Sequence, residues 1–192
     1  MVMFNDIQDK LKKALDKPRF EHTIGVMYTA GCMAMAHEYD VSKAMLAGLL
    51  HDCAKCMTHE DRLLLCDKHD VKVTASEYEN KALLHAKAGA ILAKEEYDIN
   101  DIEILHAIAV HTTGEPDMNM LDKIIYIADY IEPGRDKAPN LEYVRSLAYK
   151  DLDACMAQIL YDTLNYLNSH GGHIDPTTAE ANEFYMEYRK EF

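Results

Sequence analysis

Residues 43–55, KAMLAGLLHDCAK, form a short apolar stretch that ends in two residues able to bind a metal ion, His51 and Asp52. The apolar residues recur with helical spacing, and imidazole and carboxylate groups at the end of such a run are rarely buried without a partner. The same stretch contains Cys53-x-x-Cys56, the spacing of a redox pair or of half a zinc site. Thiol chemistry and metal chemistry therefore compete as interpretations.

The cysteines do not complete a site of either kind. A structural zinc site usually needs two close pairs of ligands, and Cys32, Cys66 and Cys155 stand alone. A thioredoxin-like pair would follow a strand, whereas Cys53 and Cys56 lie in an apolar helical run. An odd number of scattered cysteines suits a reducing compartment. The pattern favours small buried thiols, which leaves the histidine and the aspartate as candidates for chemistry.

Helical periodicity dominates the whole chain, and no alternating segment predicts a strand. Pro18 suits the first turn of one helix, Ser42 is expected to cap the next, and Thr58 a third. The predicted helices cover residues 22–39, 43–55, 60–68, 81–96, 101–112, 120–132, 141–150 and 152–167. Gly171-Gly172 then breaks the chain before Thr177-x-x-Glu180, a capping-box pattern that opens a last helix.

The sequence thus predicts an all-α protein of roughly eight to ten helices, folded as a single compact domain over residues 1–192. The motif-bearing core is expected at about 18–135, and a helical C-terminal extension at about 140–192. No repeat, low-complexity tract or linker divides the chain.

The charge balance limits the partners. The chain has 33 acidic and 20 basic residues and a formal net charge of −13, which disfavours a general binder of nucleic acid or of anionic membranes. No apolar run approaches the ~20 residues that span a bilayer, and the start of the chain lacks a signal-peptide core. We therefore expect a cytoplasmic protein without nucleic-acid or membrane partners, in which single basic residues inside a cleft can still bind phosphate.

Acidic and imidazole groups occur among small or apolar residues in several of the predicted helices. These residues are His22, His51, Asp52, His85 and Asp129, with His111 at a helix end. A shared ion would compensate the buried charges, and two imidazoles with two carboxylates suit iron, manganese, zinc or magnesium. The alternative is a set of histidines and aspartates that each find a separate partner in the core.

The order His22, then His51-Asp52, then Asp129 matches the H…HD…D signature of the HD phosphohydrolase superfamily. The chain further resembles the bacterial symmetrical diadenosine tetraphosphate hydrolases of the YqeK type. The blocks that carry this resemblance are RFEHTIGV (19–26), AGLLHDCAK (47–55), LLHAKAGA (83–90), AIAVHTTG (107–114) and KIIYIADYIEPGR (123–135). The helical tail is compatible, so the resemblance covers nearly the whole chain.

The resemblance implies a single HD-domain helical bundle whose metal ligands are His22, His51, Asp52 and Asp129, with iron as the ion. It implies a small-molecule dinucleoside polyphosphate or nucleotide as partner, and cleavage of diadenosine tetraphosphate in its middle to two ADP. It also implies a homodimer.

Three basic residues lie near these ligands in the sequence: Lys55, Arg19 and Arg135. We predict that they bind phosphate, against the alternative of ordinary surface charges. His85 and His111 are predicted to contact the phosphoryl group or to protonate the leaving phosphate, with a second metal as the alternative. The predicted catalytic groups are Asp52, Lys55, His85 and His111, and His22, Asp52 and Asp129 are predicted to border the substrate as well.

The segment SHGGHIDP is open to two interpretations. Gly171 and Gly172 would let backbone amides approach an anion or a base, with His173 beside them; the alternative is a plain loop between helices.

Two other functions compete with symmetrical hydrolysis. One is an HD phosphohydrolase acting on another nucleotide, as a nucleotidase or a phosphodiesterase. The other is a nucleotide-binding module without turnover.

Overall fold

The structure is a computed structural model that describes residues 2–189, and every regular element in that range is helical. Within residues 2–189, eleven α-helices and one 3₁₀ helix follow one another, which confirms the predicted all-α class. They are α1 (Val2–Ala14), α2 (Lys17–Ala36), α3 (Val41–Leu50), α4 (His59–Lys68), α5 (Ala75–Glu79), α6 (His85–Tyr97), α7 (Ile102–Val110), α8 (Met120–Ile131), α9 (Leu141–Leu147), α10 (Leu152–Ser169), α11 (Pro176–Tyr185) and η1 (Met186–Tyr188).

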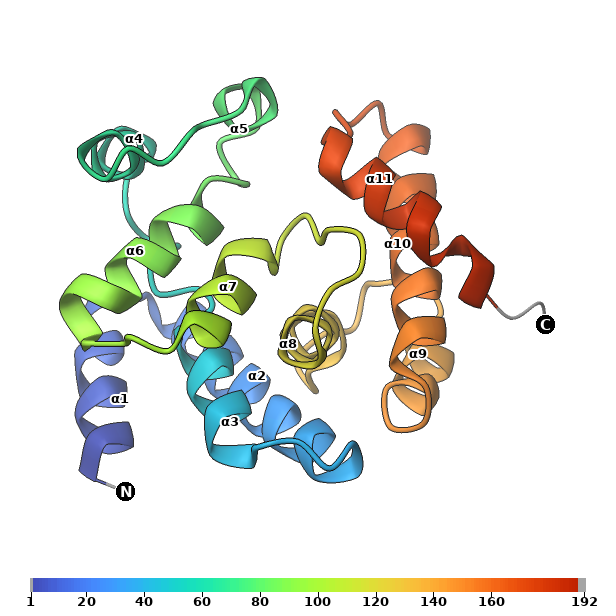
Figure 1. The fold of residues 1–192 in the computed structure, drawn as a ribbon, viewed down its shortest axis with the longest axis horizontal. Coiled ribbons are helices and arrows are strands. Elements are labelled where there is room, and N and C mark those ends of the chain that lie inside the picture. The colour runs from blue at the N-terminus through green and yellow to red at the C-terminus, as the bar shows by residue number, and fades with distance from the viewer. Residues whose placement is uncertain (1, 190–192) are drawn as a thin grey trace.

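Helix α8 is the centre of the molecule. Figure 1 shows it nearly end on, with α2, α3 and α7 to one side and α10 to the other, and all four pack against it. Ile124, Ile125, Ile127 and Ala128 are fully buried. A helix that is apolar nearly all round belongs in a core, so Asp129 is carried by the most enclosed helix of the fold.

Helices α2 and α3 lie unusually close together. A Cβ atom added at Gly48 would lie 3.1 Å from Cα of Met27 and 3.2 Å from the carbonyl oxygen of Val26. Only a residue without a side chain permits this approach of two backbones. The short distance brings the rings of His22 and His51 together, with their centroids 5.4 Å apart.

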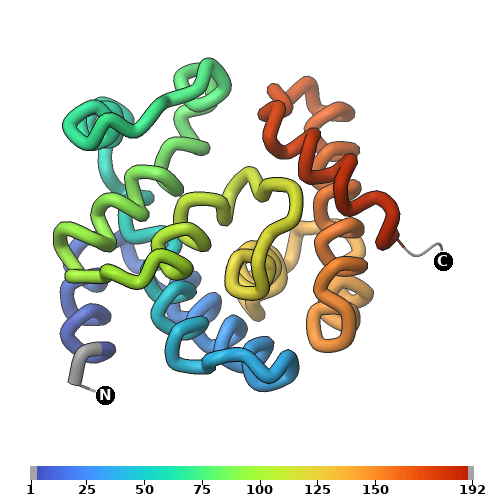
Figure 2. The backbone as a smooth tube through the Cα atoms, viewed as in Figure 1, coloured from blue at the N-terminus to red at the C-terminus, as the bar shows by residue number. Residues whose placement is uncertain are grey.

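The remaining helices form two flanking groups. Figures 1 and 2 show α4, α5 and α6 on one side of α8 and α9, α10 and α11 on the other. Helices α4 and α6 bury a small apolar cluster of their own, which consists of Ala54, Cys66, Leu84, Ala88 and Ile91. No helix in the part of the chain described here is both long and apolar enough to cross a membrane.

Two of the predicted caps are wrong. Asp40, not Ser42, caps α3 by accepting the Lys43 N–H at 2.9 Å. Asp175, not Thr177, caps α11, because Pro176 suits the first helical position and the cap is the residue just before it, two residues earlier than predicted. The Thr58 cap of α4 is confirmed.

Four predicted helices, α3, α6, α7 and α9, are three residues shorter than expected, and two helices were not predicted. Helix α3 ends at Leu50, and residues 51–56 form a series of turns; α6 begins at His85 rather than at residue 81. Helices α1 and α5 were not predicted.

Candidate metal and phosphate site

Four side chains from three parts of the chain meet beside α8. His22 comes from α2, His51 and Asp52 follow the end of α3, and Asp129 lies in α8. The Nε2 atom of His22 lies 3.0 Å from Oδ1 of Asp129, and Nε2 of His51 lies 4.0 Å from the same oxygen. Nε2 of His51 is also 3.4 Å from Oδ2 of Asp52. The four residues predicted as metal ligands are therefore brought to one point.

Three histidines around this point are held by the same kind of local hydrogen bond. Each places its Nδ1 atom against a backbone carbonyl three residues earlier: His51 on Gly48 at 2.7 Å, His111 on Ile108 at 2.7 Å and His85 on Ala82 at 2.5 Å. A carbonyl only accepts, so Nδ1 carries the hydrogen and a neutral ring leaves its Nε2 lone pair free. All three Nε2 atoms lie within 4.0 Å of an Asp52 oxygen.

His22 is oriented by a buried carboxylate that the sequence did not lead us to predict. Its Nδ1 lies 3.0 Å from Oε1 of Glu132, a residue only 5% exposed, whose Oε2 accepts the Gly134 N–H at 2.6 Å. A Cβ atom on Gly25 would lie 2.5 Å from that Oε2. No local pattern in the sequence identifies Glu132 as this partner, because a glutamate before a Pro-Gly helix stop is typical of the surface.

The cluster fits a divalent metal ion. Nε2 of His22, Nε2 of His51 and Oδ1 of Asp52 are buried without a hydrogen-bond partner. Leaving such atoms unpaired costs about 1–3 kcal/mol each, and an ion would satisfy all of them. One ligand atom from each of His22, His51 and Asp129 can be chosen so that all lie within 4.8 Å of one another. Mixed nitrogen and oxygen donors suit the transition metals and magnesium.

Both carboxylates of the cluster stay ionised. Burial alone would raise the pKa of Asp52, but the neighbouring imidazoles of His51, His111 and His85 outweigh it and hold this pKa well below its ordinary value. Burial likewise opposes ionisation of Asp129, but the adjacent imidazole of His22 and the charge of Arg135 outweigh it and hold its pKa below the ordinary value. The site therefore presents negative charge to a cation.

The three basic residues predicted to bind phosphate also lie here. Nη1 of Arg19 is 2.6 Å from Oδ2 of Asp52, and Nζ of Lys55 is 3.7 Å from Oδ1 of the same residue. Arg135 donates from Nη2 to Oδ1 of Asp129 at 2.5 Å and from Nε to the Asp129 carbonyl at 2.9 Å. The acidic protein thus carries a local group of cations at this cluster.

Arg145 of α9 fixes the loop that carries Arg135, and it was also not predicted. It donates to the carbonyls of Ile131 at 3.0 Å and of Arg135 at 2.8 Å, which ties the end of α8 to the loop. Nothing in the sequence distinguishes it from a surface arginine.

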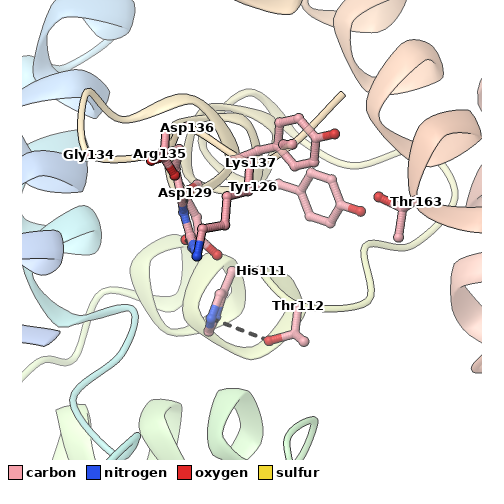
Figure 3. A pocket seen from close by; sticks show the side chains of 11 residues that line it. His111, Thr112, Tyr126, Asp129, Gly134, Arg135, Asp136, Lys137 and Thr163 are labelled. Atoms are coloured by element: carbon pink, nitrogen blue, oxygen red, sulfur yellow. Dashed lines mark hydrogen bonds and ion pairs between the residues drawn. The ribbon is translucent and has the colours of Figure 1, made fainter. Parts of the chain in front are cut away.

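His85 and His111 lie together beside Asp52. Their Nε2 atoms are 3.0 Å apart, and Nε2 of His85 is 3.0 Å from Oδ1 of Asp52 and 3.1 Å from Nζ of Lys55. Burial lowers the pKa of His85 to about 4, so this ring is neutral at pH 7. Figure 3 shows His111 and Thr112 side by side at the edge of a cavity of about 490 Å³ that also reaches Asp129.

The segment Gly171–His173 lies elsewhere. Gly171 and Gly172 are exposed, and His173 places Nε2 3.1 Å from the hydroxyl of Ser76 and Nδ1 3.6 Å from a carboxylate oxygen of Glu79. These residues line neither of the two cavities beside the cluster of histidines and aspartates. The structure thus groups them with α5 rather than with the predicted ligands.

The cysteines of the opening stretch are free thiols. Cys53 is buried as expected, but Cys56 is exposed, so the prediction of buried thiols is wrong for Cys56, which lies in the turns that follow α3. Burial raises the pKa of the Cys53 thiol to about 12. A thiol with so high a pKa is a poor nucleophile, in agreement with the preference for metal chemistry over thiol chemistry.

Known proteins are similar to this chain in sequence and in architecture. A protein of Halalkalibacterium halodurans named symmetrical bis(5'-nucleosyl)-tetraphosphatase is 40% identical over an alignment of 184 residues that covers 93% of this chain and 95% of that protein. A Bacillus subtilis protein of the same name is 36% identical over 168 residues, covering 88% and 89% of the two chains.

A solved structure from Clostridium acetobutylicum, described as a predicted HD superfamily hydrolase involved in NAD metabolism, is 38% identical. It superposes with a TM-score of 0.92 and covers 97% of this chain and 98% of that one. The sequence model of the HD domain matches residues 19–134. These matches and the geometry of the cluster lead to one assignment: the chain belongs to the HD domain family.

Proposed function

We propose that this protein is a metal-dependent hydrolase that cleaves diadenosine tetraphosphate between its second and third phosphates and releases two ADP. The observation that carries the proposal is the set of unpartnered buried atoms of His22, His51 and Asp52, surrounded by three basic side chains. The printed name of the full-length relatives, symmetrical bis(5'-nucleosyl)-tetraphosphatase, supports the substrate and the position of the cut.

The metal is proposed to be held by His22, His51, Asp52 and Asp129. When bound, it supplies a Lewis acid that polarises a phosphoryl oxygen and lowers the pKa of water near it. Among the ions that suit these donors, iron is proposed because of the family resemblance, and manganese, zinc and magnesium are the alternatives. Elemental analysis of the purified protein identifies the ion, and the absence of iron would overturn that choice.

The chain's own side chains position the polyphosphate. Arg19 and Arg135 offer forked donors that match phosphate oxygens, and Lys55 adds a compact charge beside Asp52. His111 lines the adjacent cavity together with Thr112, where it is placed to hydrogen-bond the departing phosphate. Nε2 of His85 lies 3.0 Å from Nε2 of His111 and 3.0 Å from Oδ1 of Asp52, and His85 is proposed to contact the phosphoryl group at this point.

A product assay tests the proposal. Purified metal-loaded protein is incubated with diadenosine tetraphosphate, and the nucleotides are separated by chromatography. ADP as the sole product is the expected result. AMP with ATP would mean asymmetric cleavage, and bound but uncleaved substrate would mean a binding module; either result overturns the proposal.

A cytoplasmic homodimer completes the proposed picture, supported by the family resemblance. Light scattering behind a sizing column measures the oligomeric state directly, and a monomer at working concentration would exclude the dimer.

A further inference from the structure

Arg135 lines two separate cavities whose lining residues differ in chemical character, since tyrosines line only the first of them. The first, of about 490 Å³, is lined by Tyr126, Tyr130, Lys137 and Thr163 together with Asp129 and Arg135 themselves. It adjoins a second hollow of about 280 Å³, since both are lined by Tyr130, Lys137, Ala138 and Thr163. We call these two together the tyrosine groove.

The groove has the composition of a nucleoside site. In Figure 3, Tyr126 and Thr163 face one another across it, and Asp129 and Arg135 stand at its inner end. At its outer end Tyr166 is 56% exposed and stacks on His170, with ring centroids 4.2 Å apart. Aromatic faces with a few polar groups are what a purine and a ribose require.

The other cavity, on the far side of Arg135, has different contents. It measures about 330 Å³ and is lined by Asp16, Pro18, Arg19, His22, Glu132 and Arg135, with Gly134 between them. We call it the arginine notch. None of its lining residues is an aromatic other than the proposed ligand His22, so it offers cations for phosphate but no stacking surface for a base.

Resting on the proposed function, we infer that recognition of the dinucleotide is one-sided. The tyrosine groove binds one nucleoside. The other half of the bound substrate extends along the arginine notch, where its base makes no contact. A symmetrical substrate must extend in two directions from its scissile bond, and the two exits here are chemically unequal. The second nucleoside is then dispensable.

The inference adds a class of substrate, the nucleoside 5'-tetraphosphates. Water adds to phosphorus and the P–O–P bridge between the second and third phosphates breaks. The oxygen of water stays on the attacked phosphate, the bridging oxygen leaves on the other phosphate, and the hydrogens of water pass to solvent as the new phosphate ends ionise. Adenosine 5'-tetraphosphate and water thus give ADP and pyrophosphate. A mixed dinucleotide of adenosine and uridine gives ADP and UDP, whatever the second base.

The first test compares three substrates on the wild-type, metal-loaded protein. We expect kcat/KM for adenosine 5'-tetraphosphate and for the adenosine–uridine tetraphosphate to lie within about threefold of the value for diadenosine tetraphosphate, because no contact with a second base is lost. A hydrophobic contact with a base is worth about tenfold or more, so values lower by that factor for both substrates would overturn one-sided recognition. No cleavage of diadenosine tetraphosphate itself would refute the proposed function instead.

The second test locates the gripped nucleoside. Tyr166→Ala removes one aromatic face from the groove, while Tyr28→Ala removes a tyrosine of α2 that is 59% exposed and lines neither cavity. We expect the Tyr166→Ala protein to show KM raised on the order of fivefold, by the same factor for the mononucleoside and the dinucleoside substrate, with kcat little changed. Tyr28→Ala should leave both KM values unchanged. An unchanged KM in Tyr166→Ala would overturn the assignment of the groove.

Discussion

The Nδ1 atom of His22 lies 3.0 Å from Oε1 of Glu132, and this contact fixes which nitrogen of the ring faces Asp129. A carboxylate can only accept, so the hydrogen stays on Nδ1 and Nε2 keeps its lone pair for an ion. Ligands held in this way bind metal more tightly than free ones, because the ring is already oriented and its basicity is raised.

Glu132→Gln should therefore weaken metal binding by about 10–100-fold. The amide oxygen of glutamine can still accept the Gly134 N–H, so the change acts mainly on the contact with His22. Titration calorimetry with Mn²⁺ measures the affinity. Glu95→Gln, at a pair with Lys68 far from the cluster, is the control and should bind as the wild type does. Equal affinities in all three proteins would show that Glu132 does not orient His22.

Gly25→Ala should have a similar effect by a steric route. Its Cβ would lie 2.5 Å from Oε2 of Glu132, so the carboxylate must move away from His22. Gly31→Ala is a matched control on the same helix, where the new Cβ meets only the flexible side chain of Met45 and residue Val41. If the two effects share one cause, the Gly25→Ala and Glu132→Gln changes will be less than additive in a double mutant. Full additivity of their effects on metal affinity would contradict this.

Asp129→Asn should abolish stoichiometric metal binding and hydrolysis while the far-ultraviolet circular dichroism stays helical. The wild type should lose thermal stability when the metal is removed by a chelator, by about 2.7 kcal/mol if the ion was present at ~100 times its dissociation constant. The variant should not respond to the chelator. Asp67→Asn, at an exposed position on α4, serves as control and should behave as the wild type. A chelator response in Asp129→Asn equal to that of the wild type would refute the ligand assignment.

Arg19→Gln should raise KM for diadenosine tetraphosphate by about tenfold or more, since a hydrogen bond to a charged group contributes about 1.5–3 kcal/mol. Lys17→Gln removes the same charge two residues away, from a side chain that pairs only with Glu21 on the surface. The control separates a specific phosphate contact from a general change in charge. Equal changes of KM in the two variants would favour the general effect.

His106 should make stability depend on pH. Its Nδ1 is 3.0 Å from Oδ2 of Asp122 and its Nε2 is 3.1 Å from Oε1 of Glu115. Burial lowers the pKa of His106, but the two carboxylates outweigh burial and the net shift is upward. The folded state therefore favours the protonated ring. This stabilisation is fully present below the unfolded pKa of about 6.5 and is lost as pH rises through the higher folded value.

His106→Gln should accordingly reduce the free energy of unfolding more at pH 6 than at pH 9. The difference is expected near 0.5 kcal/mol, because the ring is 44% exposed and solvent screens the pairs. Urea unfolding in the presence of a chelator measures it without interference from metal binding. A loss of stability that is the same at both pH values would show that the imidazole is not charged in the pair.

Some of the site could be predicted because it depends on local chemistry. His51 and Asp52 end an apolar helix, and Asp129 interrupts an apolar one; a buried charge at such positions requires a partner wherever it lies in the fold. Glu132 could not be identified this way. A glutamate before Pro-Gly at a helix end is typical of the surface, and only the packing of α2 against α8 brings it to His22.

The helix ends show the same division. Thr58 was identified as a cap because a cap depends on residues within one turn. The competition between Asp40 and Ser42, two good caps on either side of Val41, is decided by where α3 begins against its neighbours, which no local pattern contains.

The sequence by itself determined the helical class and the family, and it predicted the candidate metal ligands, because helical periodicity and motif spacing are properties of the chain alone. The tertiary structure alone decided that Glu132 and Arg145 support the site, that His173 lies against α5, and that the two exits from Arg135 differ. The reason is physical: these depend on distances between segments far apart in sequence, which are set only when the side chains between the helices pack together.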